Sequence, residues 1–234
     1  MNAQLPLALR TRADQRFDSF VGAADGTLAQ LQALARGGST DWIYLHGPAA
    51  TGKTHLLLAV CRLAGEATRS AAYLPLASAA GRAAEALAAL HGHALVAIDG
   101  IEAIAGDDAD ELALFDFHNR AHDAGTAVLY AARAPADALP ILLPDLRSRL
   151  AQCTRVVLQP LDDAGRRHVL EDRAVRSGLQ LDPAALDWLL RRVGRDLASL
   201  AALLDRLDRA SLAAQRRVTV PFLRQVLGED GRAA

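Results

Sequence analysis

The chain has 234 residues, of which 51% are hydrophobic and 23% are charged; this composition is typical of a globular protein and excludes a disordered one. The length favours one domain, or one domain with a smaller appendage. The formal net charge of −1 provides no basic excess for direct binding to nucleic acid, so we expect any connection to DNA to be indirect. No apolar run approaches the roughly 18 residues of a membrane span, and the N-terminus lacks a signal-peptide pattern, so a soluble cytoplasmic protein is expected.

The two cysteines, Cys61 and Cys153, lie far apart in the sequence. Neither has a further Cys or His at the spacing of metal ligands, so the sequence supports neither a zinc site nor a disulfide framework. Both are predicted to be small buried apolar residues.

The first element in chain order is a short segment, Gln4-Leu5-Pro6-Leu7-Ala8-Leu9. In an extended conformation its two-residue period places the three leucines on one side, with a glutamine at its head. Two interpretations are open from the residues alone: the segment packs on its own domain, or its leucines enter a groove on a partner.

The next element is a buried apolar run at 42–46, which predicts a strand, and a helix is predicted at 53–64. The loop between them matches the P-loop pattern. Backbone N–H groups of such a loop surround phosphates, its lysine reaches the β- and γ-phosphates and its final hydroxyl can bind Mg²⁺. The lysine is Lys53, the only lysine among 26 Lys and Arg residues, and a guanidinium would not replace its ammonium in a tight pocket. The predicted nucleotide-binding residues are Gly47, Pro48, Ala49, Ala50, Thr51, Gly52, Lys53, Thr54 and His55.

A second apolar run, at 94–99, is bounded by glycines and predicts a strand covered on both faces. It ends in Asp99. Because P-loop proteins hold Mg²⁺ with the loop hydroxyl and an acidic residue of this kind, Thr54 and Asp99 are the predicted metal ligands.

Further short apolar runs alternate with helical segments up to about residue 160, which predicts an α/β fold with a parallel five-stranded sheet. These runs lie at 71–74, 127–130 and 155–158, and a further helix is predicted at 109–124. Beyond Pro160 only helix signals remain, which predicts a small all-helical lid. Its helices are expected from Asp162-Asp163 to near Gly178, from Asp182-Pro183 to near Gly194, onward to about Gln215, and from Thr219. The expected organisation is an N-terminal tail at 1–16, a nucleotide-binding domain at 17–160, a lid at 161–229 and a disordered tail at 230–234.

Together these features resemble the AAA+ ATPases of the DnaA branch and, within it, the Hda family of DnaA-related regulators. The resemblance covers nearly the whole chain. Besides the P-loop and the strand ending in Asp99, the segments that carry it are the linker at 17–22, box VII at 143–150 and the end of the lid at 205–217.

The resemblance implies roles for several residues. Arg149 of box VII matches an arginine finger, which would act on the nucleotide of a neighbouring protomer, although a solvated surface arginine is the alternative. Arg195 matches the sensor 2 arginine that contacts phosphates from the lid; its alternative is an ion pair at a helix end. Phe20 and Val21 of the linker are expected at the nucleotide.

The resemblance also extends to the N-terminal tail, which is similar to a hexapeptide motif that binds the replicative DNA sliding clamp. Gln4, Leu5, Leu7 and Leu9 are the matching residues. Clamp binding is therefore expected in preference to packing on the chain's own domain.

Two positions depart from the pattern of AAA+ motors. The place of the usual catalytic base, directly after Asp99, holds Gly100, and Glu102 is displaced from it by two residues. The polar sensor 1 residue is expected near Ala131-Ala132, where alanine cannot hydrogen-bond a phosphate or water. Nucleotide binding is therefore expected with weak or absent hydrolysis.

The function predicted from these features is that of a regulator of replication initiation. It would hold ADP or ATP with Mg²⁺, dock on the clamp and stimulate ATP hydrolysis by the initiator DnaA, thereby preventing re-initiation. It would lie in the bacterial cytoplasm and associate with the nucleoid by binding the clamp. A homodimer is left open. The alternative is a self-sufficient AAA+ ATPase such as a helicase loader, and a DNA-binding initiator is disfavoured by the charge balance.

Overall fold

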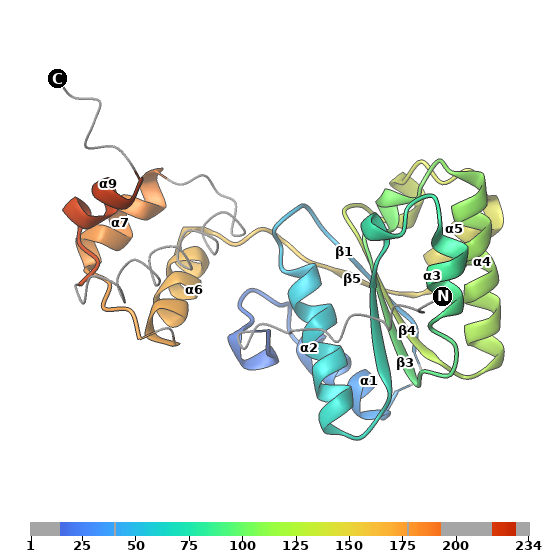
Figure 1. The fold of residues 1–234 in the computed structure, drawn as a ribbon. Coiled ribbons are helices and arrows are strands. Elements are labelled where there is room, and N and C mark those ends of the chain that lie inside the picture. Colours follow the sequence, from blue (N-terminus) through green and yellow to red (C-terminus); the bar gives the residue numbers. More distant parts are fainter. Residues whose placement is uncertain (1–14, 40, 177, 193–216, 228–234) are drawn as a thin grey trace, which may run out of the picture. The chain divides into compact units, whose positions relative to one another are not determined.

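The computed structural model describes residues 15–39, 41–176, 178–192 and 217–227 (Figure 1). The chain divides into two compact units, Met1–Gln159 and Pro160–Ala234. The predicted tail residues Gln4, Leu5, Leu7 and Leu9 lie outside the described residues, as does Arg195 on the helix expected to reach about Gln215.

The first unit is built on a five-stranded sheet in which all paired strands are parallel, in the order β2-β3-β4-β1-β5. The strands are β1 (Ile43–His46), β2 (Ala71–Pro75), β3 (Leu95–Asp99), β4 (Ala127–Ala132) and β5 (Thr154–Val157). The predicted fold class is thus confirmed. The largest difference in strand bounds is at β4, which continues two residues past the predicted run at 127–130.

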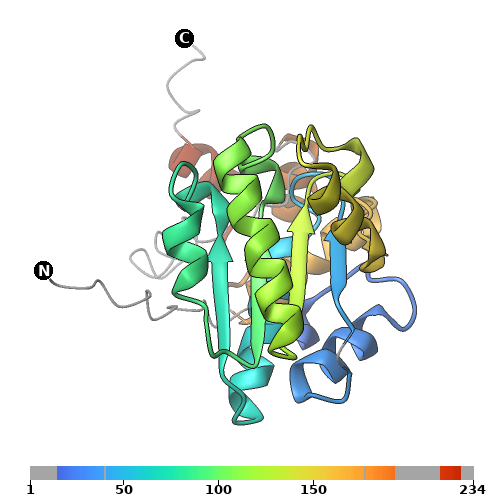
Figure 2. The same cartoon turned by 90° about the vertical axis from the view of Figure 1, so that its right-hand side faces the viewer.

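Helices cover both faces of this sheet, because alternate residues of each inner strand point to opposite sides. Ile43 and Leu45 of β1 are fully buried against α1 (Thr27–Arg36) and α2 (Lys53–Glu66). Tyr44, between them, is buried on the other face, where Figure 2 shows the longest helix lying along the sheet. The helices of that face are α3 (Ala83–Ala88), α4 (Asp108–Asp123) and α5 (Pro144–Gln152). The resulting three layers fix the carboxyl ends of β1, β3 and β4 side by side.

The second unit contains the helices α6 (Asp163–Arg176), α7 (Pro183–Arg192) and α9 (Val220–Leu227). Leu170, Leu186 and Leu223, one from each helix, are buried in a common apolar cluster. An isolated parallel bridge joins Leu181 to Val218. The predicted helical lid is thus confirmed.

Both cysteines are free. Cys61 is buried, and burial raises the pKa of its thiol to about 12. The prediction for Cys153 was wrong, because this residue caps the end of α5 and is only half-buried, with its Sγ donating to the Arg149 carbonyl at 3.5 Å. In the described part of the chain no helix is long and apolar enough to span a membrane.

Candidate nucleotide-binding site

The predicted P-loop connects β1 to α2 at the carboxyl edge of the sheet. A side chain at Gly47 would collide with the carbonyl oxygen of Leu158, so glycine is required there. Gly52 has φ +89° and Ala50 has φ +62°, so the loop curls through two left-handed residues before the helix begins. The loop backbone is therefore folded tightly on itself, as a phosphate-binding loop requires.

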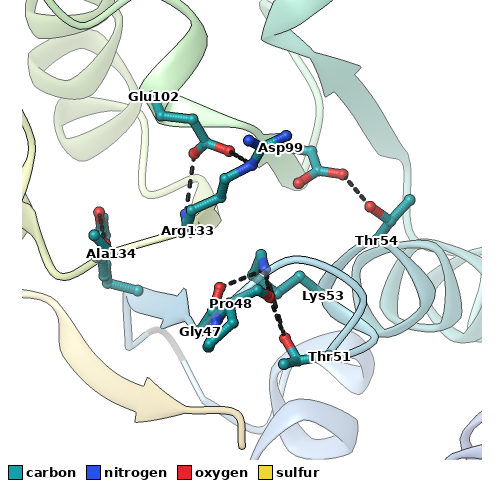
Figure 3. Close-up of polar contacts among 10 residues, drawn as sticks. Gly47, Pro48, Thr51, Lys53, Thr54, Asp99, Glu102, Arg133 and Ala134 are labelled. Carbon is teal, nitrogen blue, oxygen red and sulfur yellow. Dashed lines mark hydrogen bonds and ion pairs between the residues drawn. The ribbon is translucent and has the colours of Figure 1, made fainter. Parts of the chain in front are cut away.

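The Lys53 side chain is enclosed by this loop and is only 9% exposed. Its Nζ donates to the carbonyl oxygens of Gly47 at 2.6 Å and Pro48 at 2.7 Å, contacts that Figure 3 shows. Burial lowers the pKa of the ammonium, while the carboxylates of Glu102 and Asp99 act in the opposite direction. A phosphate in the loop would be a stronger acceptor for this cation than two neutral carbonyls.

The N-terminus of α2 adds a second attraction for anions. Its N-cap is Gly52, which offers no side chain to accept from the N–H groups of the first turn. Those N–H groups and the positive end of the helix dipole are therefore available to a phosphate at the loop.

The two predicted metal ligands lie together beside the loop. The Thr54 Oγ1 donates to Asp99 Oδ2 at 2.5 Å, so a hydroxyl and a carboxylate oxygen from different elements converge (Figure 3). Oxygen donors of this kind suit Mg²⁺. The sequence analysis missed a third member, since the hydroxyl of Tyr73 on β2 donates to the same Asp99 oxygen at 3.0 Å. Burial, then the charge of Asp99, raises the pKa of this phenol, which keeps it protonated as a donor.

The linker packs against the start of α2. It contains Phe20 and Val21, two further residues of the predicted nucleotide site. The Phe20 ring lies over Gly52, where a Cβ added to the glycine would come within 2.5 Å of Phe20 Cε2. The same ring lies 5.6 Å from the His55 ring, centroid to centroid, and His55 Nε2 is 2.7 Å from the carbonyl oxygen of Arg16. Val21, the next linker residue, is half-buried. The linker thus forms one side of the loop.

An ion pair that the sequence analysis did not predict lies at the carboxyl end of β4. Arg133 is the first residue beyond β4, and its Nε lies 3.1 Å from Glu102 Oε1. The other oxygen, Glu102 Oε2, accepts from the backbone N–H of Arg133 at 3.1 Å. Ala131 and Ala132, expected near the sensor 1 position, are fully buried within the strand. In the sequence, the one feature that marks Arg133 is its place directly after the two alanines at the end of a predicted strand.

Arg149 lies on a separate element, in the last turn of α5, and is exposed. Within the described residues no hydrogen bond or ion pair joins its guanidinium to the P-loop. The helix is anchored through Leu146 and Leu150, which are fully buried against the same face of the sheet as α4. Arg149 is therefore presented to solvent from a fixed helix.

Comparison with known proteins matches the C-terminal unit to a family model and the chain as a whole to a known fold. Residues 163–227 match the family model described as Hda, lid domain. The fold is similar to that of domain III of the replication initiation protein DnaA from Thermotoga maritima, with a TM-score of 0.77 at 16% identity over 95% of this chain and 99% of that one.

Two longer proteins show the same fold. AMPPCP-bound DnaA from Aquifex aeolicus gives a TM-score of 0.67 at 19% identity, over 83% of this chain and 66% of that one. The RuvB Holliday junction branch migration motor of Thermotoga maritima gives 0.65 at 17% identity, over 92% and 71%. The C-terminal unit is thus an Hda lid domain on a chain with the fold of DnaA domain III, which confirms the predicted resemblance to the Hda family of DnaA-related AAA+ proteins.

Proposed function

We propose that this protein is a DnaA-related regulator of replication initiation that binds ADP with Mg²⁺, docks on the sliding clamp and stimulates ATP hydrolysis by DnaA. The observation that carries the proposal is the Hda lid domain joined to a unit with an intact P-loop. Prevention of re-initiation would follow, because an initiator whose ATP has been hydrolysed is removed from the active pool.

Nucleotide binding is supported by the geometry of the loop. Lys53, the uncapped start of α2 and the glycine backbone all offer donors to phosphates. Thr54 and Asp99 would hold Mg²⁺, which would neutralise phosphate charge. DnaA from Aquifex aeolicus binds the triphosphate analogue AMPPCP, which fits a nucleotide site on this fold.

Weak hydrolysis by the protein itself is supported by the groups around Asp99. Gly100 offers no carboxylate to activate water. Glu102 cannot easily replace it, since one of its oxygens is ion-paired with the Arg133 guanidinium and the other accepts a hydrogen bond from the Arg133 backbone N–H. A carboxylate engaged in this way is not positioned as a general base, because a base must lie within hydrogen-bond reach of the proton that it takes from water.

The regulatory action is assigned to Arg149. Its guanidinium is exposed on the anchored helix α5, so it can reach the nucleotide of a second protein rather than its own. A cation delivered to the charge that develops on a neighbour's γ-phosphate accelerates hydrolysis by about 10³–10⁵ in other systems. This task does not depend on the protein's own catalytic groups.

Docking on the clamp is assigned to Gln4, Leu5, Leu7 and Leu9, whose pattern fits an apolar groove. Clamp binding would bring the protein to replicating DNA without a DNA-binding surface of its own, in line with a net charge of −1. The cytoplasm, at the nucleoid, is the corresponding location, and a homodimer is compatible with this role.

The test is turnover of labelled ATP bound to DnaA, in the presence of clamp-loaded DNA and this protein. The unaltered protein should stimulate turnover, and Arg149→Ala should not. Arg147→Ala is the matched control, because Arg147 is an exposed arginine on the same helix. Equal stimulation by Arg149→Ala, or brisk hydrolysis with no DnaA present, would overturn the proposal in favour of a self-sufficient ATPase.

A further inference from the structure

Tyr73 of β2 reaches the predicted metal ligands from the strand beside Asp99. Strands β2 and β3 pair so that Tyr73 lies opposite Ala97 and Pro75 lies opposite Asp99. Tyr73 is therefore two residues below Asp99 along the paired strands, and side chains at that spacing point to the same face of a sheet. The long side chain of Tyr73 spans this offset, and its hydroxyl donates to Asp99 Oδ2 at 3.0 Å.

The ring of Tyr73 is held by packing. It is partly buried against the apolar cluster that α1 and α2 form with the sheet. The strand is also tied to α2, because the Cys61 Sγ donates to the carbonyl oxygen of Ala72 at 3.6 Å. A hydroxyl on a ring that is packed in this way has little freedom, so its hydrogen bond fixes the position of the oxygen that accepts it.

The two oxygens of the Asp99 carboxylate have different surroundings. Oδ2 accepts from both the Thr54 hydroxyl and the Tyr73 hydroxyl, whereas within the described residues Oδ1 accepts no hydrogen bond. Each carboxylate oxygen has two lone pairs, so the two hydroxyls together occupy Oδ2. The carboxylate is thus anchored through one oxygen and offers the other to a cation.

The two donors to Oδ2 differ in what else they must do. Thr54 is itself a predicted ligand of Mg²⁺, so its hydroxyl serves the metal as well as Asp99. Tyr73 has no such second task. Groups that hydrogen-bond a ligating carboxylate fix its orientation, and their loss weakens metal binding by about 10–100-fold in other proteins.

We propose that Tyr73 is a positioning residue of the metal site, which holds the Asp99 carboxylate for Mg²⁺ and thereby sets how strongly Mg²⁺ raises the affinity for a nucleotide. The inference rests on the proposed nucleotide site. Tyr73 acts through Asp99 and contacts neither the metal nor the nucleotide in this role. Its contribution should therefore disappear when Mg²⁺ is withheld or when the Asp99 carboxylate is replaced.

The experiment is calorimetric titration of the full chain with ADP, in EDTA and at a series of free Mg²⁺ concentrations. Tyr73→Phe removes the hydroxyl and keeps the ring. We expect the Mg²⁺ concentration that gives half of the gain in ADP affinity to rise about tenfold, while the affinity in EDTA stays within about twofold. Free ADP binds Mg²⁺ identically in every titration, so a difference between variants reports the protein.

Tyr44→Phe is the matched control. The Tyr44 hydroxyl also donates at 3.0 Å, to the carbonyl oxygen of Ala134, but its ring is buried on the other face of the sheet. The control should change neither the affinity in EDTA nor the Mg²⁺ dependence.

A double variant tests whether Tyr73 acts through Asp99. In the Asp99→Asn background we expect Tyr73→Phe to change the ADP affinity with Mg²⁺ by less than about twofold, because the carboxylate that it positions is gone. Independent effects that simply add would show that the hydroxyl acts on another group, and would overturn the proposal.

The two levels of proposal fail in different ways. If the unaltered protein binds no ADP, the nucleotide site itself is wrong and the inference falls with it. If it binds ADP and Mg²⁺ adds no affinity, the nucleotide site stands and the role of Tyr73 fails. An unchanged Mg²⁺ dependence in Tyr73→Phe, or an equal loss of ADP affinity with and without Mg²⁺, would overturn the inference alone.

Discussion

The carboxylate of Glu111 accepts a hydrogen bond from the backbone N–H of Leu143 at 2.8 Å. Its other oxygen accepts from the N–H groups of Gly106 at 2.7 Å and Leu142 at 3.1 Å, and the side chain is fully buried. Leu143 is the N-cap of α5, which provides no side-chain cap of its own. One buried carboxylate on α4 therefore fixes the start of the helix that carries Arg149.

Removal of this carboxylate should destabilise the fold. Glu111→Ala leaves three backbone N–H groups without their acceptor and a cavity in the core, so we expect a loss of roughly 3 kcal/mol in the free energy of unfolding. Glu85→Ala, at an exposed site on α3, should stay within about 0.5 kcal/mol. Urea denaturation measures both. A Glu111→Ala protein as stable as the Glu85→Ala control would contradict the assigned role.

The strands were predictable because each of the five lies in a short, mostly apolar run, which can be recognised from a few neighbouring residues. The P-loop and Asp99 were predictable for the same reason, since their spacing is contained in a few residues. The helices α1 and α3 were missed: their N-caps, Gly26 and Arg82, make no side-chain cap hydrogen bond that would mark a start. Alanine-rich segments of this kind give little contrast between buried and exposed faces.

Contacts between distant segments could not be predicted from the pattern. Glu111 and its neighbour Asp110 belong to an acidic run, yet both are buried. Asp110 accepts from the N–H groups of Gly81 at 2.6 Å and Ala83 at 3.0 Å, about thirty residues away in the chain. The pairing of Glu102 with Arg133 has the same cause: sheet order brings them together, and spacing does not reveal it.

His118 gives the protein a defined response to acid. Burial, followed by the charges of Arg149 and His122, lowers the pKa of this side chain to about 4. Its Nδ1 lies 3.2 Å from the Tyr130 hydroxyl, and its ring meets Trp42 edge-on at 4.3 Å. The folded state thus keeps His118 neutral, whereas the unfolded chain takes up a proton below about pH 6.5.

Stability should therefore be complete above about pH 6.5 and fall as the pH drops toward 4. For His118 alone the loss at pH 5 is on the order of 2 kcal/mol. His46, whose pKa is also lowered by burial, acts in the same direction. Denaturant titrations at pH 7.5 and pH 5 should show a smaller difference for His118→Gln than for the unaltered protein. The exposed His91→Gln should keep the full difference; an unchanged difference in His118→Gln would refute the assignment.

Gly52 is predicted to tolerate no side chain. Its φ of +89° and the nearby Phe20 ring both oppose a Cβ, so Gly52→Ala should weaken ADP binding severely and lower the melting temperature. Gly65→Ala is a matched control on α2, because a Cβ there meets nothing within 4 Å, and it should be neutral or stabilising. Calorimetric titration with ADP and a thermal melt of each variant test both parts of the prediction. A Gly52→Ala protein that binds ADP normally would contradict the prediction, because the Phe20 ring would then move aside without loss of the site.

Nucleotide binding should depend more on Lys53 than on Asp99. A diphosphate can be held by backbone N–H groups and the Lys53 ammonium with limited help from a metal, so Lys53→Ala should abolish ADP binding and Asp99→Asn should weaken it modestly. Titrations with and without Mg²⁺ measure the two contributions. Equal loss in both variants would mean that the metal, rather than the loop, dominates the affinity.

The N-terminal segment should be separable from the fold. Replacement of Gln4, Leu5 and Leu7 by Ala removes the side chains assigned to the clamp groove, and we expect clamp binding to be lost while ADP binding and melting temperature stay unchanged. Substitution of the flanking polar residues Asn2 and Thr11 by Ala is the control and should leave clamp binding intact. Surface plasmon resonance on immobilised clamp and a thermal melt of each variant are sufficient. If the triple variant melts several degrees lower, the leucines belong to the chain's own core, since buried leucines contribute about 1.5–3 kcal/mol each, and the clamp assignment fails.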